Sequence, residues 1–241
     1  MSVRLQEVYR RLLAAFGPQH WWPAKFPFEV VVGAVLVQNT SWRNVERAIG
    51  NLREAGLLEP HALAALPEET LQDLIRPAGY FRIKAKRLRS LVHFLVERYG
   101  GSLEAMFATP PATLRDDLLA VHGIGKETAD SILLYALRRR KFVVDAYTRR
   151  FLARHGLIAP GATYAEVQSL FERNLPPSPR LYNEYHALIV RLGKEFCRTK
   201  PRCDRCPLQP LLGAAVGNIY HQGAKTTKKG GKWIVSSSSH M

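Results

Sequence analysis

A short turn that contains two glycines constrains the fold of this chain more than any other feature of its sequence. The turn reads HGIG and spans residues 122–125. Before it, Leu114, Leu118 and Leu119 share one helical face, and after it apolar residues recur at intervals of three and four as far as Ala136. Two helices are therefore predicted to meet at this turn.

The same turn is suited to bind a phosphate group. Gly123 and Gly125 carry no Cβ atom and can adopt backbone conformations closed to other residues, so an anion can approach the main chain closely. The amides at the start of the second helix, its dipole and the charge of Lys126 would all favour that anion. Most such turns only connect helices, but Ile124 and the following Thr-Ala pair favour a clamp that holds nucleic acid without reading its bases.

The charge of the chain also points to nucleic acid. Its 35 Lys and Arg residues exceed its 20 Asp and Glu residues and give a net charge of +15, which attracts phosphate polyanions. A merely soluble basic surface and an anionic membrane are the alternatives. No stretch approaches the roughly 18–20 apolar residues of a spanning helix. The segment 2–16 has the spacing of an amphipathic core helix, although a transit peptide could look similar.

Helical spacing dominates the rest of the sequence and predicts an all-α protein. The segment FEVVVGAVLVQNT, residues 28–40, is rich in β-branched residues and could form a strand. We predict a buried helix there, because no partner strand with turn signals lies nearby. From residue 224 the composition changes to KTTKKGGKWIVSSSSHM, which predicts a disordered tail that could in part derive from cloning.

Five segments in this order resemble the helix-hairpin-helix DNA glycosylases of the endonuclease III superfamily. They are GAVLVQNT (33–40), GYFRIKAKRL (79–88), HGIGKETADSIL (122–133), VVDAYTRRFLARHGL (143–157) and GKEFC-x5-C-x2-C (193–206). The resemblance covers roughly residues 25–210. It implies a two-lobed helical fold with double-stranded damaged DNA as the partner. Residues 25–139 would form the lobe that contains the hairpin, and residues 1–24 and 140–223 would form the other.

Asp145 is the candidate catalytic residue. It precedes the helical run AYTRRFLARHG, where an Asp is most often an N-cap. The resemblance implies that it is also the catalytic aspartate of the family. Cleavage of a base–sugar bond builds positive charge on the sugar, which a fixed carboxylate can stabilise while it helps to place a water molecule.

Two further residues are implied to act on the duplex while the damaged base leaves the stack. Gln38 would fill the gap that the flipped base leaves, and Tyr80 stands where endonuclease III has a wedging leucine. Gln38 could instead be an ordinary polar residue at a helix end, and Tyr80 a partly buried aromatic residue of a turn.

Glu127 stands where bifunctional relatives place the lysine that forms a Schiff base with the sugar. A carboxylate cannot form an imine, and Lys126 would point about 100° away around the helix. Tyr147 replaces a histidine of endonuclease III. This pair resembles the monofunctional branch that removes alkylated purines such as 3-methyladenine, although Glu127 could simply be an acid favoured by the helix dipole.

Aromatic residues of the N-terminal region complete the resemblance to that branch. Trp21, Trp22 and Trp42 are similar to its aromatic base pocket, where stacking would hold a cationic alkylated purine. Tryptophans are also common in cores, so packing alone is the alternative.

Cys197, Cys203 and Cys206 follow a predicted helix, with spacings that suit a metal or an iron–sulfur cluster. The family has a four-cysteine [4Fe-4S] cluster here, but the fourth position is near Leu212 and the chain has no other cysteine. An iron–sulfur cluster with another ligand or with three irons, zinc with a ligand such as His221, free thiols and a disulfide all remain open. Clustered cysteines without a disulfide framework fit a reducing cytoplasm.

The sequence thus predicts a monofunctional base-excision-repair DNA glycosylase, a cytoplasmic monomer associated with the nucleoid if bacterial. One alternative is a bifunctional endonuclease III that acts on oxidised pyrimidines. The other is a DNA-binding module that has lost its catalytic activity.

Overall fold

The computed structural model describes residues 1–212. The predicted tail at 224–241 and His221 lie outside these residues. The described part is helical and contains no strand, which confirms the all-α prediction. Its helices are α1 (Ser2–Phe16), α2 (Pro27–Leu36), α3 (Trp42–Glu54), α4 (Pro60–Ala65), α5 (Glu68–Ile75), α6 (Phe81–Tyr99), α7 (Leu103–Ala108), α8 (Pro111–Ala120), α9 (Lys126–Ser131), α10 (Ala146–Arg154), α11 (Tyr164–Asn174) and α12 (Pro179–Glu195). Short turns of helix are η1 (Arg76–Ala78), the π-helical η2 (Ile132–Ala136), η3 (Cys203–Arg205) and η4 (Gln209–Leu211).

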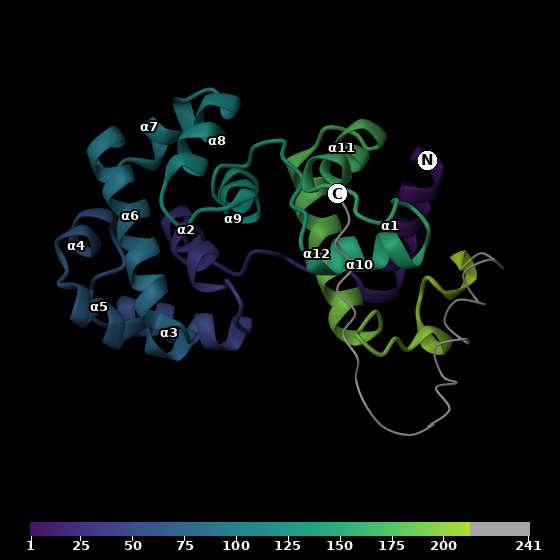
Figure 1. Cartoon of the computed structure of the whole chain (residues 1–241), viewed down its shortest axis with the longest axis horizontal. Coiled ribbons are helices and arrows are strands. Elements are labelled where there is room, and N and C mark those ends of the chain that lie inside the picture. Colours follow the sequence, from purple (N-terminus) through teal and green to yellow (C-terminus); the bar gives the residue numbers. More distant parts are fainter. Residues whose placement is uncertain (213–241) are drawn as a thin grey trace, which may run out of the picture.

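The helices form two lobes that lie side by side (Figure 1). Helices α2 to α9 make one lobe, which we call the hairpin lobe. Helix α1 joins α10, α11 and α12 in the other, which we call the aspartate lobe because Asp145 caps α10. Two stretches of chain, 17–26 and 137–145, connect the lobes (Figure 1). We propose the boundaries expected from the sequence for these lobes, which are residues 25–139 for the hairpin lobe and residues 1–24 with 140–223 for the aspartate lobe.

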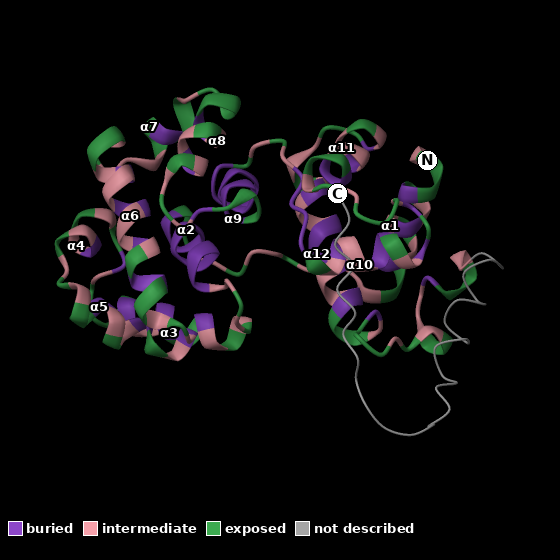
Figure 2. Cartoon of the chain, viewed as in Figure 1, coloured by how far each residue is buried: buried purple, intermediate pink, exposed green. Residues whose placement is uncertain are grey.

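The β-branched segment forms the buried helix α2, as predicted in preference to a strand. Pro27 occupies its first turn, where a missing amide hydrogen costs nothing, and every residue from Phe28 to Leu36 is buried (Figure 2). A helix enclosed on all sides lacks a polar face, so its composition resembles that of a strand. Gly33 lets the Trp22 indole pack closely, since a Cβ atom there would lie 3.2 Å from Trp22 Cζ2.

A buried polar network joins the two lobes through Asp130 of α9. Arg115 of α8 donates to both carboxylate oxygens, at 2.7 and 3.1 Å. From α11, Tyr164 donates its hydroxyl at 2.8 Å, and Gln168 donates its amide at 2.7 Å. The same Gln168 amide also donates to the carbonyl of Phe142 at 2.7 Å. The network fixes the hairpin helix against the aspartate lobe and so sets the geometry of the space between them.

No helix of residues 1–212 is both long and apolar enough to cross a membrane.

Candidate functional site

A pocket of about 270 Å³ lies where the two lobes meet. The structure brings together around it all the residues for which the sequence predicted a base pocket, along with the candidate catalytic aspartate. Its lining includes Trp21, Trp22, Trp42, Glu127, Tyr135, Asp145, Tyr147, His186 and Lys194. We call it the aromatic pocket. It combines flat apolar walls with two carboxylates and one amine.

The tryptophans pack against one another in the lining of this pocket. Trp22 meets Trp42 edge-on with ring centroids 5.0 Å apart, and Trp21 lies 5.7 Å from Trp42. Trp22 also contacts Tyr135 at 5.2 Å. All three indoles are only partly buried, so they support each other while leaving faces that line the pocket. Packing and base stacking are therefore compatible roles here.

Asp145 divides its carboxylate between two tasks. It is the N-cap of α10, and its Oδ1 accepts a hydrogen bond of 2.7 Å from the amide of Thr148. Its Oδ2 lies 3.6 Å from His186 Nε2, and the residue is 9% exposed. One oxygen thus anchors the side chain, and the other lies near His186, which lines the aromatic pocket together with Asp145.

Glu127 stands at the junction between the aromatic pocket and a second hollow that runs along the hairpin. Its side chain is accessible to solvent, but the protein atoms around it displace part of its hydration shell. This desolvation, followed by the negative charge of Asp145, raises the pKa of Glu127 to about 7. The neighbouring Lys126 is exposed and lines the second hollow but not the aromatic pocket.

The second hollow, the hairpin groove, has a volume of about 880 Å³ and is formed mainly by the turn between α8 and α9. The two glycines of the turn differ in what they allow. Gly123 has a φ of +81°, and a Cβ atom on it would lie 2.1 Å from Arg87 Cγ. Gly125 has a φ of −91°, and a Cβ atom there would have no neighbour within 4 Å. Gly123 is needed by the fold, whereas Gly125 leaves open space beside the first amides of α9.

Gln38 is held at the edge of this groove by three partners. Its amide nitrogen donates to Thr128 Oγ1 at 3.0 Å and to the carbonyl of Gly123 at 3.3 Å. Its oxygen accepts a hydrogen bond of 2.5 Å from Arg87. To fill a gap in DNA, Gln38 would have to exchange these contacts for new ones. Arg87 was missed by the sequence reasoning, since nothing distinguishes it from the other basic residues of α6.

Tyr80 projects from the surface with 69% exposure, in a left-handed backbone conformation with a φ of +48°. Lys84 fixes the turn that contains Tyr80. Its buried ammonium donates to the carbonyls of Ala78 and Leu36 at 2.8 Å each. Burial, followed by the charge of Arg87, lowers the pKa of Lys84 to about 8. Lys84 thereby ties the Tyr80 turn to the end of α2, two residues before Gln38.

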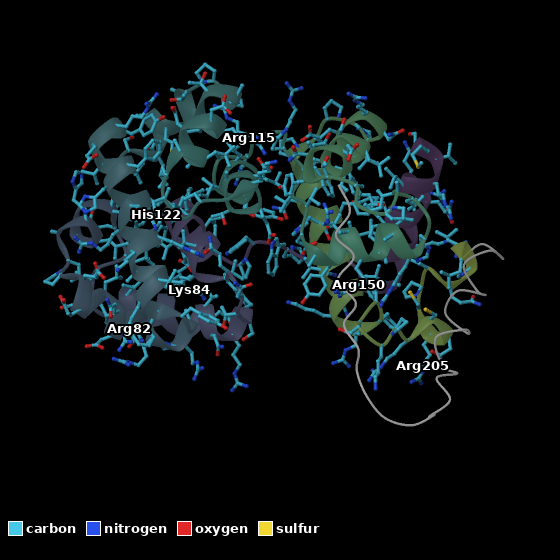
Figure 3. All side chains as sticks on the ribbon, viewed as in Figure 1. Arg82, Lys84, Arg115, His122, Arg150 and Arg205 are labelled. Carbon is cyan, nitrogen blue, oxygen red and sulfur yellow. The ribbon has the colours of Figure 1, made fainter. Side chains whose placement is uncertain are left out.

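Basic side chains are present on both lobes. Figure 3 labels Arg82, Lys84, Arg115 and His122 on the hairpin lobe, and Arg150 and Arg205 on the aspartate lobe. Arg150 lies over the ring of Tyr147, with its guanidinium carbon 5.0 Å from the ring centroid. Lys84 is buried and Arg115 is paired with Asp130, but Arg82 and Arg205 are exposed, so a polyanion placed across the two lobes would meet positive charge on each side.

The three cysteines do not fit a four-thiolate cluster. The chain contains only three, and no group of three His, Cys, Asp or Glu side chains within residues 1–212 could hold a metal ion. Cys197 Sγ accepts a hydrogen bond of 3.3 Å from Arg154, and burial raises the pKa of Cys203 and Cys206. Arg150 and Arg154 instead hold this segment against α10 by donating to the carbonyls of Cys197, Arg198 and Thr199.

The sequence matches known DNA repair proteins. Residues 32–177 match the model of the HhH-GPD superfamily base excision DNA repair proteins. A protein of Methanocaldococcus jannaschii, provisionally described as a DNA repair glycosylase, is 53% identical over 207 residues, or 85% of this chain and 94% of the relative. Endonuclease III of Thermotoga maritima is 30% identical over 206 residues, or 85% of this chain and 90% of the relative.

The fold also matches solved structures. The H. pylori 3-methyladenine DNA glycosylase bound to 1,N6-ethenoadenine aligns with a TM-score of 0.69 at 31% identity, covering 80% of this chain and 95% of the other. A non-covalent complex of endonuclease III with DNA aligns with a TM-score of 0.77 at 23% identity, covering 92% and 99%, and so shares the fold. Because the family model spans more than half of the chain and the relatives align over most of their length, this protein belongs to the HhH-GPD superfamily and is a base-excision-repair DNA glycosylase.

Proposed function

We propose that the protein is a monofunctional DNA glycosylase that removes alkylated or otherwise damaged bases. The observation that carries this proposal is the identity and setting of Glu127. The position from which bifunctional enzymes of the superfamily present a lysine holds a carboxyl group here, at the junction of the hairpin groove and the aromatic pocket. The similarity to a 3-methyladenine glycosylase at 31% identity adds support.

The proposed reaction needs little acid catalysis, because a base alkylated on the ring is cationic and already a good leaving group. The indoles of Trp22 and Trp42 would stack on such a base, since aromatic faces attract cations. As the base–sugar bond breaks, the free Oδ2 of Asp145 would stabilise the positive charge on the sugar and orient the attacking water. Glu127, with its pKa near 7, could exchange a proton with the base or the water at neutral pH.

DNA would be held by the parts that surround the pocket. Amides at the start of α9 would contact a backbone phosphate beside Gly125, with Lys126 adding its charge. Gln38 would enter the gap left by the flipped base, and Tyr80 would wedge the opposite strand. Since the net charge of +15 favours contacts with backbone phosphates that release counterions, we expect the affinity for duplex DNA to fall steeply with rising salt concentration.

The experiment that tests this function compares three duplexes, which carry a 3-methyladenine-type lesion, thymine glycol or an abasic site. Strand breaks would be measured with and without hot alkali. We expect breaks at the alkylated lesion only after alkali, because base release leaves an intact strand. Breaks without alkali, or an adduct trapped by borohydride, would refute the monofunctional assignment.

One observation favours the bifunctional alternative. Lys194 of α12 places an amine in the lining of the aromatic pocket, from which it could reach the sugar in place of the missing hairpin lysine. If a borohydride adduct forms, the Lys194→Gln variant decides its origin: loss of the adduct would assign the imine to Lys194. Lys126→Gln is the matched control, because Lys126 does not line this pocket; it is assayed at saturating DNA, since Lys126 also belongs to the proposed phosphate clamp.

One substitution distinguishes a glycosylase, whether monofunctional or bifunctional, from a DNA-binding module without activity. Asp145→Asn keeps an N-cap side chain but removes the negative charge. We expect base release to fall by at least about 100-fold, in line with the loss of a single charge-stabilising group, while the dissociation constant for duplex DNA changes little. Unchanged turnover would remove Asp145 from the mechanism.

A further inference from the structure

His186 is a buried polar residue beside the site to which the mechanism above gives no role. It lies on α12 with 6% exposure and lines the aromatic pocket. Its Nδ1 is 2.5 Å from the hydroxyl of Tyr135, and its Nε2 is 3.6 Å from Oδ2 of Asp145. That Nε2 atom has no hydrogen-bond partner among the described residues. The three side chains thus form a row of Tyr135, His186 and Asp145.

The row has a defined direction of donation. Burial lowers the pKa of His186, so the imidazole is neutral at physiological pH and one ring nitrogen carries the proton. Burial holds the pKa of Tyr135 well above its ordinary value, so the phenol keeps its proton and can donate it to Nδ1. An acceptor role for Nδ1 leaves the proton on Nε2, which faces the carboxylate of Asp145. The opposite tautomer would aim a lone pair at that carboxylate and is disfavoured.

Neutrality of the imidazole matters for the chemistry proposed above. An imidazolium beside Asp145 would cancel the negative charge that the developing sugar cation needs. A neutral N–H orients the oxygen while leaving the net charge in place. The distance of 3.6 Å is too long for a formed hydrogen bond, and such contacts in free enzymes often tighten when substrate binds.

The row also couples the wall of the pocket to the carboxylate. The ring of Tyr135 contacts the indole of Trp22 at 5.2 Å, and its hydroxyl contacts His186. Other charged groups that line the pocket are Glu127 of α9 and Lys194 of α12. Glu127 forms no ion pair with His186, so Asp145 is its only carboxylate neighbour within 4 Å among the described residues.

We propose that His186 is a positioning residue for Asp145, with its Nε2–H tautomer selected by the hydroxyl of Tyr135. This proposal rests on the proposed role of Asp145 in the glycosylase reaction. The roles differ by residue: Asp145 would act on the sugar, His186 would act on Asp145, and Tyr135 would act on His186.

The first test reads the tautomer without reference to activity. Nitrogen-15 NMR of the histidine rings distinguishes a protonated Nε2 from a protonated Nδ1. We expect the His186 signal, assigned by its loss in His186→Gln, to show Nε2–H in the wild type and a mixture of tautomers in Tyr135→Phe. A wild-type signal from the Nδ1–H tautomer would overturn the proposal.

The second test measures single-turnover base release on the alkylated duplex. We expect Tyr135→Phe to slow it about 10-fold and His186→Leu about 100-fold, the range seen when a group that orients a catalytic residue is lost. His186→Gln can still offer an N–H and should recover part of the rate lost in His186→Leu. The dissociation constant for DNA should stay unchanged in all three variants.

A matched control is Tyr185→Phe on the same helix. Tyr185 is buried and donates to the carbonyl of Leu5 at 2.8 Å, away from the pocket, so this variant loses a buried hydrogen bond without touching the row. Its rate per folded molecule should equal that of the wild type. If His186→Leu fails to fold, the rate of Tyr135→Phe, which removes only one oxygen atom, decides the second test.

The outcomes separate the two proposals. If Asp145→Asn turns over normally, the assignment of Asp145 fails. If Asp145→Asn is inactive but both Tyr135→Phe and the folded His186 variants react at the wild-type rate, the role of Asp145 stands and the positioning role of His186 is wrong.

Discussion

At the scale of single residues, the carboxyl of Glu127 differs from an ordinary surface acid in when it loses its proton. Desolvation and the nearby Asp145 raise its pKa to about 7, so the protonated form is common at neutral pH. A group whose pKa is raised on folding stabilises the folded state below its unfolded pKa, and this contribution is lost as the pH rises through the folded pKa. Between about pH 4.5 and 7 the unfolded chain loses this proton while the folded protein keeps it, so the free energy of unfolding falls over this range.

Replacement of Glu127 by Gln should remove this penalty. Relative to the wild type, we expect Glu127→Gln to gain about 1 kcal/mol in the free energy of unfolding at pH 8 and nothing at pH 4.5, the gain being limited by solvent screening of an exposed side chain. Urea unfolding at the two pH values measures it. Carbon-13 NMR of the Glu127 carboxyl should further show a lower pKa in Asp145→Asn, and an unchanged pKa there would contradict the coupling.

The sequence could predict a functional residue only where the neighbouring sequence identifies it. Asp145 and Glu127 stand at fixed distances from a helix start or a glycine turn, so the resemblance could assign them. Arg87 with Gln38, and Tyr135 with His186, lie 49 and 51 residues apart in the chain. Their partners are decided by how the helices pack, and the sequence around a histidine on the buried face of an amphipathic helix does not indicate which carboxylate it faces. Lys84 was missed for a related reason: a lysine in a basic helix is normally exposed.

At the scale of the structural element, the two glycines of the turn between α8 and α9 have different roles, although the sequence predicted the same role for both. Gly123 has a left-handed conformation and is packed against Arg87, while Gly125 has an ordinary conformation and faces open space. The prediction of two helices at this turn holds, and the buried residues Leu114 and Leu118 form the inner face of α8. The difference between the glycines follows from the position of α6, which no local pattern encodes.

Two alanine variants exploit this difference. Gly123→Ala should destabilise the protein by about 1–3 kcal/mol through backbone strain, with more added by the clash with Arg87, as measured by urea unfolding. Gly125→Ala should leave stability within about 0.5 kcal/mol of the wild type but weaken binding to undamaged duplex DNA, because the added methyl group occupies the approach to the α9 amides. Normal DNA affinity in a folded Gly125→Ala protein would contradict the phosphate clamp.

At the scale of the whole molecule, the relative position of the lobes depends on a buried charge. Asp130 of the hairpin lobe accepts hydrogen bonds from Tyr164 and Gln168 of the aspartate lobe, and Arg115 neutralises it. Glu127 and Asp145 approach each other across the same boundary. The geometry of the aromatic pocket therefore depends on a network that does not line it.

Loss of the guanidinium should be costly here. Arg115→Leu leaves a buried carboxylate without its counterion, and we expect a loss of about 3–5 kcal/mol in the free energy of unfolding. Arg76→Leu is the matched control, because its ion pair with Asp73 is exposed on both sides at the surface of the hairpin lobe and should contribute no more than about 1 kcal/mol. Equal effects of the two substitutions in urea unfolding would show that the network does not hold the lobes together.

The order of the helices also bears on how the protein is made. Helices α2 to α9 are consecutive in the chain, so the hairpin lobe can fold as soon as it leaves the ribosome. Helix α1 precedes them in the chain, yet one of its contacts, between Leu5 and Tyr185, spans 180 residues. During synthesis α1 must therefore wait for α12, and the whole sequence of the hairpin lobe is made before α12 completes the pocket around Asp145.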